Sequence, residues 1–449
     1  MKKLILIQFV VVLLLTSCLV GKKYSRPEMA IPEKYNVTDS TVVIQDTIIN
    51  LQWFELFGDK VLNSLIQQAL DTNINLKNAA LRVQQSRSFY QNSKASLLPS
   101  IGYKATAEIN DPDDDYFDVM GTASWEIDFW GKLRHAKRAS YAQLLASEEG
   151  LKTVKTTLVS DVANLYFQMR DLDNRIVVSI KTLESRTLYY NMVNERFLKG
   201  ESSELDKLQA EQQLAHVEAA LQSLRRELSF TERSLNILLA QNPQPIPRGL
   251  ENADQTMIPE IPAGLPSSLL EQRPDVKAAE NILFAETEKI GMYQAMRLPS
   301  FNLTAFFGLA SPDINTLSNS MAGSLSGMIM GPLFEFGKNK RRVDIQRAEA
   351  EIALNSFMDT WRSALGDVEN SMVSISTFRD ELTARNRQVQ AARKALMLTK
   401  AKYDEGYTNY LEVLIAESYA YDAEMLLSVT RARQLSATIS LYRALGGGW

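Results

Sequence analysis

Residues 98–103 read Leu-Pro-Ser-Ile-Gly-Tyr, and residues 298–303 read Leu-Pro-Ser-Phe-Asn-Leu, an offset of 200 residues (298 minus 98). Further along, Trp130-Gly131-Lys132 corresponds to Phe336-Gly337-Lys338, and Gly200 corresponds to Gly406, at an offset of 206 (406 minus 200). Self-similarity at a nearly fixed offset indicates a duplicated architecture. The chain is therefore predicted to contain two tandem repeats, with a loop lengthened between residues 100 and 130 or in their partners.

The composition fits a folded protein and excludes several functions. The chain has 449 residues, of which 45% are hydrophobic and 23% charged, and its net charge of -4 gives no reason to expect nucleic acid. No nucleophile with a base, metal-ligand cluster or phosphate-binding loop is recognisable, so we expect no enzyme activity, cofactor or metal site. The two histidines, His135 and His216, lie in polar helical runs and are predicted to be solvated.

The N-terminus has the pattern of a secretory signal. Lys2-Lys3 precedes an apolar run over residues 4–15, which is too short to span a bilayer, and residues 1–17 are predicted to be a cleaved signal peptide. The following Cys18 is the only cysteine, and Leu15-Thr16-Ser17-Cys18 resembles a bacterial lipobox. We therefore expect Cys18 to be lipidated, which leaves no thiol for a disulfide.

Residues 101–129 alternate between apolar and polar side chains with period two, as strands with two different faces do. The strands are about ten residues long, the span of a membrane β-strand. Residues 301–335 repeat the pattern less cleanly. A soluble sandwich also alternates, but aromatic residues near the strand ends favour a membrane wall. The polar face then lines an aqueous lumen, with Lys104, Glu108, Glu126 and Asp128 among its side chains.

Two features have more than one interpretation. The acidic loop over residues 111–115 fits a solvated turn or a cation site. The fifteen methionines fit hydrophobic packing or binding of soft metal ions.

The remaining sequence predicts helices. Residues 133–199 and 338–405 contain no proline and predict two helices, each about 100 Å long. Shorter helices are predicted over residues 62–95 and 204–240 in the first repeat and over 266–295 and 409–444 in the second. In each repeat, the summed length of the two short helices nearly equals the length of the long helix, so the short helices are expected to stack end to end.

The predicted organisation follows from these lengths. Repeat 1 covers residues 62–240 and repeat 2 covers 266–445, with a strand hairpin at one end of each and a turn at Gly200 or Gly406 at the other. The lipidated segment 18–61, the proline-rich linker 241–265 and the tail 446–449 are expected to form an equatorial belt. Four strands cannot close a barrel, because the smallest bacterial barrels need about eight, so several chains must share one.

Several phrases resemble the TolC-like outer-membrane efflux channels, specifically their NodT-type lipoprotein branch, which serves tripartite RND efflux systems. The resemblance covers nearly the whole mature chain and rests on five motifs in the family's order. They are Tyr24-Ser25-Arg26-Pro27, Trp53-Phe54-Glu55-Leu56-Phe57-Gly58-Asp59, Leu270-Glu271-Gln272-Arg273-Pro274-Asp275-Val276, Arg297-Leu298-Pro299-Ser300 and Gly331-Pro332-Leu333-Phe334.

The resemblance implies a mostly α fold with a membrane β-barrel. Three copies of the chain would form a homotrimer whose shared twelve-stranded barrel continues into a long α-helical periplasmic barrel. The implied partners are a periplasmic adaptor (membrane fusion) protein, an inner-membrane RND-type transporter and outer-membrane lipid. The implied location is the outer membrane, with the helices extending into the periplasm.

The resemblance also assigns roles at the helical tip. The adaptor-docking turns correspond to Gly200, Glu201, Ser202, Gly406 and Tyr407. Tyr403 corresponds to a tyrosine that holds the helices in the closed state. Asp206 and Glu412 correspond to an acidic ring, which the resemblance favours over the alternative of a solvated face. Thr408 stands where some members have an arginine latch, and Ile415 where many have an aspartate, so the closure network is expected to differ here.

The predicted function is a passive, gated exit channel of a tripartite efflux pump. Two other functions also fit parts of the sequence. The protein could be an exit duct for type I protein secretion, or a non-conducting structural lipoprotein of the envelope. The alternating strands argue against the second, because such a bridge needs no polar lumen. The sequence does not identify the cargo.

Overall fold

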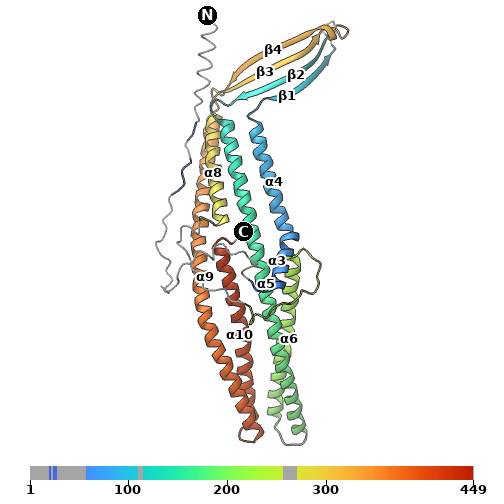
Figure 1. Ribbon diagram of the computed structural model, residues 1–449, viewed down its shortest axis with the longest axis vertical. Helices are drawn as coiled ribbons and strands as arrows, with labels where there is room; N and C mark the ends of the chain where they lie inside the picture. Colours follow the sequence, from blue (N-terminus) through green and yellow to red (C-terminus); the bar gives the residue numbers. More distant parts are fainter. Residues whose placement is uncertain (1–19, 22–23, 28–56, 110–114, 256–270, 448–449) are drawn as a thin grey trace. The chain divides into compact units, whose positions relative to one another are not determined.

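The computed structural model describes residues 20–21, 24–27, 57–109, 115–255 and 271–447 (Figure 1). The signal peptide, Cys18 and residues 111–114 of the acidic loop lie outside these residues. The chain divides into two compact units. Unit 1 comprises Met1–Ala30, Ala79–Leu151 and Pro274–Trp361, and unit 2 comprises Ile31–Asn78, Lys152–Arg273 and Arg362–Trp449. Each repeat therefore contributes to both units.

The helices confirm two tandem repeats. Helices α4 (Ile74–Ala95) and α8 (Pro274–Ala295) both have 22 residues, and their starts differ by 200. Helices α5 (Lys132–Leu198) and α9 (Lys338–Asp404) both have 67 residues, and α6 (Glu204–Leu238) and α10 (Tyr410–Ala444) both have 35, now at an offset of 206. The six additional residues thus lie between the start of the second hairpin and α9, in the predicted region. Among the described helices, none combines the length and apolar character needed to cross a membrane.

The prediction of one helix over residues 62–95 is wrong, because the chain breaks at Asn73 between α3 (Lys60–Thr72) and α4. Asn73 leaves the helical conformation with ψ 128°, and its Oδ1 accepts a hydrogen bond from Leu76 N at 3.1 Å. Its Nδ2 donates to Leu238 O, at the end of α6, at 2.8 Å. The last carbonyls of a helix lack partners within the helix, so Asn73 caps the end of one helix and the start of another.

The second repeat makes the same connection with a different residue. Arg273 stands at the position equivalent to Asn73, and its Nη1 donates to Ala444 O, at the end of α10, at 3.2 Å. A cation at a helix C-terminus also interacts favourably with the helix dipole. Arg273 of the motif over residues 270–276 thus has a structural role in unit 2.

Unit 1 contains a four-stranded antiparallel sheet in the order β1-β2-β3-β4 (Figure 1). The strands are β1 (Ser100–Glu108), β2 (Tyr116–Ile127), β3 (Ser300–Ser311) and β4 (Met321–Met330), and a short 3-10 helix, η1 (Leu317–Asn319), lies between β3 and β4. Directly opposed residues share a face of the sheet.

The register confirms the predicted alternation across all four strands. Ile101 opposes Ala123, Trp125 opposes Leu303, and Ala305 opposes Leu325, so the apolar positions share one face. The second hairpin ends earlier than its predicted range 301–335, because β4 ends at Met330, before Gly331-Pro332. Proline has no N–H to donate to a neighbouring strand.

His135 contradicts its predicted exposure: only 2% of its surface is accessible, whereas His216 is exposed as predicted. Its Nδ1 lies 2.6 Å from Glu288 Oε2 in α8. The polar residues around His135 in the sequence suggested a solvated site, but the opposing helix carries Gly291, which leaves room for the imidazole ring.

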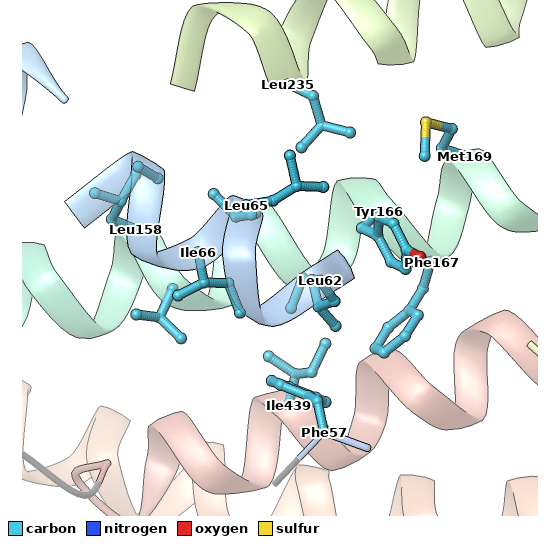
Figure 2. Close-up of a cluster of buried hydrophobic side chains, with 14 of the residues drawn as sticks. Phe57, Leu62, Leu65, Ile66, Leu158, Tyr166, Phe167, Met169, Leu235 and Ile439 are labelled. Atoms are coloured by element: carbon cyan, nitrogen blue, oxygen red, sulfur yellow. The ribbon is translucent and has the colours of Figure 1, made fainter. Parts of the chain in front are cut away.

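The core of unit 2 gathers apolar side chains from α3, α5, α6 and α10 (Figure 2). Leu62 and Ile66 of α3 pack with Tyr166 and Phe167 of α5, and all four are at most 1% exposed. Burial of such side chains stabilises the folded state by about 1.5–3 kcal/mol each.

Asp59 joins this core to the segment after α6. Its carboxylate accepts hydrogen bonds from the Tyr166 hydroxyl at 2.7 Å, Leu250 N at 2.9 Å and Gln255 Nε2 at 3.1 Å. Burial acts to raise the pKa of Asp59, but the hydrogen bonds outweigh it and lower the pKa below its ordinary value. The buried carboxylate is therefore stabilised in its charged form.

Candidate functional site: the helical tip and the polar strand face

The two tip turns of unit 2 have the same backbone. Gly200 follows α5 with φ +76°, and Gly406 follows α9 with φ +80°. Gly200 N donates to Phe197 O and Glu201 N to Arg196 O, at 2.9 and 2.8 Å, and the second turn repeats both bonds at the same distances. This is the Schellman motif, which favours glycine in the left-handed position. A Cβ at either glycine would meet nothing within 4 Å, so the positive φ explains the glycine.

The first turn holds Asp206 in a capping box. Ser203 Oγ accepts from Asp206 N at 3.1 Å, while Asp206 Oδ2 accepts from Ser203 N at 3.2 Å. Ser203 Oγ and Ser202 Oγ also donate to Oδ2, at 2.7 and 3.2 Å. These hydrogen bonds, chiefly from the Ser203 side chain, lower the pKa of Asp206 below its ordinary value. One member of the predicted acidic ring is thus oriented by its own turn.

The second turn leaves its carboxylate in a different environment. Asn409 Oδ1 accepts from Glu412 N at 3.2 Å, which caps α10. Among the described residues, the Glu412 carboxylate has no hydrogen bond or ion pair. The Thr408 hydroxyl oxygen is buried and has no hydrogen-bond partner in the described part of the chain.

A cluster of tyrosines lies where α5, α9 and α10 adjoin the two turns. Tyr403 of α9 accepts a hydrogen bond from Arg196 Nη1 of α5 at 3.3 Å. Its ring meets Tyr410 of α10 edge-on at 5.4 Å between centroids, and Tyr189 of α5 stacks on Tyr410. Burial raises the pKa of both Tyr189 and Tyr410, so their hydroxyls stay protonated. Tyr403 therefore contacts side chains from two other elements, and Arg196 is a partner that the sequence did not indicate.

A buried ionic network lies further from the turns and was missed in the sequence. Arg186 of α5 is 2% exposed. It donates to Gln213 O of α6 at 2.8 Å and to Ser418 Oγ of α10 at 3.1 Å, and its Nε lies 3.8 Å from Glu417 Oε2.

Glu417, 5% exposed, completes the network. Its Oε1 accepts from Ser185 Oγ of α5 at 2.6 Å and lies 3.5 Å from Lys400 Nζ of α9. Burial lowers the pKa of Arg186, and the Glu417 carboxylate opposes that shift. The network joins all four helices of the tip. No sequence motif marks it, because its members come from four separate stretches.

The predicted docking residues differ in exposure. Tyr407 is 79% exposed and Glu201 is also exposed, whereas Ser202 is half-buried against Asp206. Tyr407 and Glu201 thus present an aromatic ring and a carboxylate to solvent.

Of the four predicted lumen residues of unit 1, Lys104 and Glu108 lie in β1, whereas Glu126 and Asp128 lie at or just beyond the end of β2 that leads into α5. Lys104 Nζ lies 3.6 Å from Asp118 Oδ1 on the same strand face, and Glu108 is exposed at the end of β1. Glu126 Oε1 lies 2.5 Å from Lys132 Nζ at the connection to α5.

Asp128 lies one residue beyond β2. Its carboxylate accepts from Leu133 N and Arg134 N at 3.0 and 2.9 Å, so it caps the start of α5. This contact gives Asp128 a structural role at the junction between strand and helix. Across the described residues, no group of three or more histidine, cysteine, aspartate or glutamate side chains could hold a metal ion.

The sequence model of the family described as "Outer membrane efflux protein" matches residues 65–241 and 265–447. The chain belongs to this family. The cation efflux system protein CusC of Escherichia coli O6:H1 is 30% identical over 99% of this chain and 98% of that protein. The probable efflux pump outer membrane protein TtgC of Pseudomonas putida is 28% identical over 100% of this chain and 96% of that protein.

The fold agrees with solved relatives. The open state of the MtrE outer membrane channel of Neisseria gonorrhoeae has a TM-score of 0.87 and 26% identity, covering 96% of this chain and 98% of that one. The protein is therefore a TolC-like outer-membrane efflux channel protein, not an enzyme. The predicted family, location and channel function are confirmed.

Proposed function

We propose that three copies of this chain form the outer-membrane duct of a tripartite efflux pump. The four strands of each copy contribute to one shared barrel, and Cys18 carries a lipid anchor in the outer membrane. A periplasmic adaptor protein binds the tip turns, and an inner-membrane RND-type transporter supplies the cargo. Small molecules or ions are the proposed cargo, in keeping with the efflux functions in the names of the relatives.

The edges of the sheet carry the proposal of a shared barrel. Strands β1 and β4 each pair on one side only within the described chain. An unpaired edge exposes backbone N–H and C=O groups, which cannot remain unsatisfied in a bilayer. Apolar residues on the common strand face are strongly exposed in the single chain, including Ile101 at 84% and Leu325 at 77%. Neighbouring copies would satisfy the edges, and lipid would cover this face.

The two tip carboxylates support the proposed gate. In a trimer, Asp206 and Glu412 would place six carboxylates in one constriction, where like charges raise one another's pKa. This effect opposes the lowering of the Asp206 pKa by Ser203 within one chain. A ring of carboxylates favours cations and would be narrowed by divalent ions that bridge it.

The test is single-channel conductance of the purified trimer in planar bilayers. We compare wild type with Asp206→Ala plus Glu412→Ala, with and without divalent cations. We expect low wild-type conductance, a several-fold increase in the double variant, and divalent block in wild type alone.

The matched control is Glu204→Ala plus Glu211→Ala, which removes two exposed carboxylates of α6 that are not assigned to the ring. Equal conductance increases in both double variants would contradict a specific ring. Absence of ion passage in every variant, from trimers shown to be inserted, would contradict the conducting duct itself.

A further inference from the structure

The described residues that follow Cys18 bind along one side of unit 1. Val20 N donates to Trp130 O at 3.3 Å, and Tyr24 packs on Phe284 of α8 with 5.1 Å between ring centroids. Arg26 Nε lies 3.1 Å from Glu280 Oε1, one helical turn further along α8. Within the described residues 20–21 and 24–27, Tyr24 and Arg26 thus contact α8 at two successive turns.

His135 holds the start of this segment. Its Nε2 lies 3.0 Å from Val20 O, and a carbonyl oxygen can only accept, so Nε2 must carry the hydrogen. Its Nδ1 lies 2.6 Å from Glu288 Oε2, which is also 3.9 Å from Arg138 Nη1. The imidazole thus connects the backbone of the N-terminal segment to a carboxylate of α8. His135 and Glu288 are both at most 4% exposed.

Two glycines make room for this contact. A Cβ on Gly291 of α8 would lie 2.5 Å from His135 Cε1, closer than real Cβ contacts. Gly21, with φ +142°, has its own Cβ position 3.1 Å from Gly291 Cα. The chain therefore approaches α8 at a point where neither side carries a side chain.

The internal duplication shows that this site is specific to one repeat. At the positions equivalent to His135, Glu288 and Gly291, the other repeat has Arg341, Ser88 and Gln91. Arg341 and Gln91 are both exposed. The other repeat therefore lacks the imidazole and the glycine that contact residues 20–21 here, and the carboxylate that contacts the imidazole.

We propose that His135 and Glu288 form a binding site for the chain's own N-terminal segment, which fixes the position of the lipid anchor. Cys18 lies two residues before Val20, so it cannot be more than about 7 Å along the chain from the bound residue. Val20 N donates its hydrogen bond to the backbone carbonyl of Trp130, and the Trp130 ring packs with Phe129 and Phe301. Aromatic rings of this kind favour the membrane interface. The site therefore holds Val20 beside aromatic residues at the junction between β2 and α5, two residues after the proposed lipid anchor.

The lipid part of this inference rests on the proposed lipidation of Cys18, and the test separates the two. Trypsin cleaves after Lys22 and Lys23 and releases the lipidated N-terminal peptide, which mass spectrometry identifies. In full-length protein in detergent, we expect His135→Ala and Gly291→Ala to accelerate this cleavage about tenfold or more. The first variant removes both hydrogen bonds of the buried imidazole, and the second places a Cβ where the ring lies.

The controls are the equivalent positions in the other repeat, Arg341→Ala and Gln91→Ala, which should leave the cleavage rate unchanged. Arg26→Ala weakens the segment without touching His135 and should accelerate cleavage about two- to fivefold, which keeps the test valid if His135→Ala fails to fold. Equal rates in wild type and variants of matched helical content, or equal acceleration by the controls, would overturn the binding site. A released peptide without acyl chains would refute only the lipidation.

Discussion

The two tip hairpins of unit 2 share a backbone but differ in the side chains that hold them. Both turns use a Schellman glycine, with φ +76° and +80°, and both lead into a helix of 35 residues. Arg186 of α5, in contrast, is equivalent to Ala392 of α9, and buried Glu417 of α10 is equivalent to exposed Glu211 of α6. Duplication thus preserved the geometry of the turns, while the contacts between helices diverged. The divergent residues are the better candidates for control of the tip.

The largest expected effect comes from breaking the buried network. Glu417→Ala leaves the Arg186 guanidinium buried without its carboxylate, which should lower the apparent free energy of unfolding by about 3–5 kcal/mol. Urea titration of the helical circular dichroism signal measures this change. The comparison predicts a loss of less than about 0.5 kcal/mol for Glu211→Ala, the exposed equivalent in the other hairpin.

A double variant sharpens this result. Arg186→Met with Glu417→Leu replaces both charges by apolar side chains and should recover most of the stability lost in Glu417→Ala, since removal of a whole buried pair is often neutral. Equal losses in Glu417→Ala and Glu211→Ala would show that the two hairpins do not differ as the structure indicates.

Repetition and periodicity explain which parts of the fold the sequence predicted. The 206-residue offset and the absence of proline predicted α5 and α9 to within one residue at each end, and period-two alternation predicted the shared apolar face of the sheet. Asn73 was missed because its local signal is one asparagine in a helical run, and its bond to Leu238 O joins residues 165 positions apart.

The candidate site was only partly predictable for the same reason. Glycine followed by a capping residue is a local signal, so Gly200, Gly406 and Asp206 could be recognised. Arg186, Glu417 and His135 are ordinary polar residues of helical runs, and only the packing of separate helices buries them. The only sequence signal was a difference between repeats, and it marks two of the three: Arg186 and His135 differ from their equivalents, Ala392 and Arg341, whereas Glu417 has a glutamate, Glu211, at its equivalent position.

A smaller effect tests the shared backbone of the two turns. Gly200→Ala and Gly406→Ala should each lower the apparent free energy of unfolding by about 1–2 kcal/mol, since a Cβ is disfavoured in the left-handed conformation. Gly366→Ala is the matched control, because it lies inside α9 and also has free space around its Cβ position. It should stabilise the protein by about 0.5–1 kcal/mol. Unequal losses at Gly200 and Gly406 would mean that the turns are not equivalent.

The smallest expected effect concerns the two helix caps and depends on pH. Ser203→Ala and Asn409→Ala each remove a cap and should cost about 1 kcal/mol at pH 7. Because the folded-state pKa of Asp206 is lowered, the stability from its bonds with Ser203 is fully present above the ordinary pKa of aspartate, near 3.9, and is lost as the pH falls through the lower folded value.

The cost of Ser203→Ala should therefore shrink in acid. The Asn409 amide does not titrate and only accepts from a backbone N–H, so the cost of Asn409→Ala should stay nearly constant. Urea titrations of both variants and wild type at pH 7 and near pH 2.5 measure the difference. A cost of Ser203→Ala that does not change with pH would show that the capping box does not stabilise the Asp206 carboxylate. The first turn would then differ from the second in sequence but not in its response to protons.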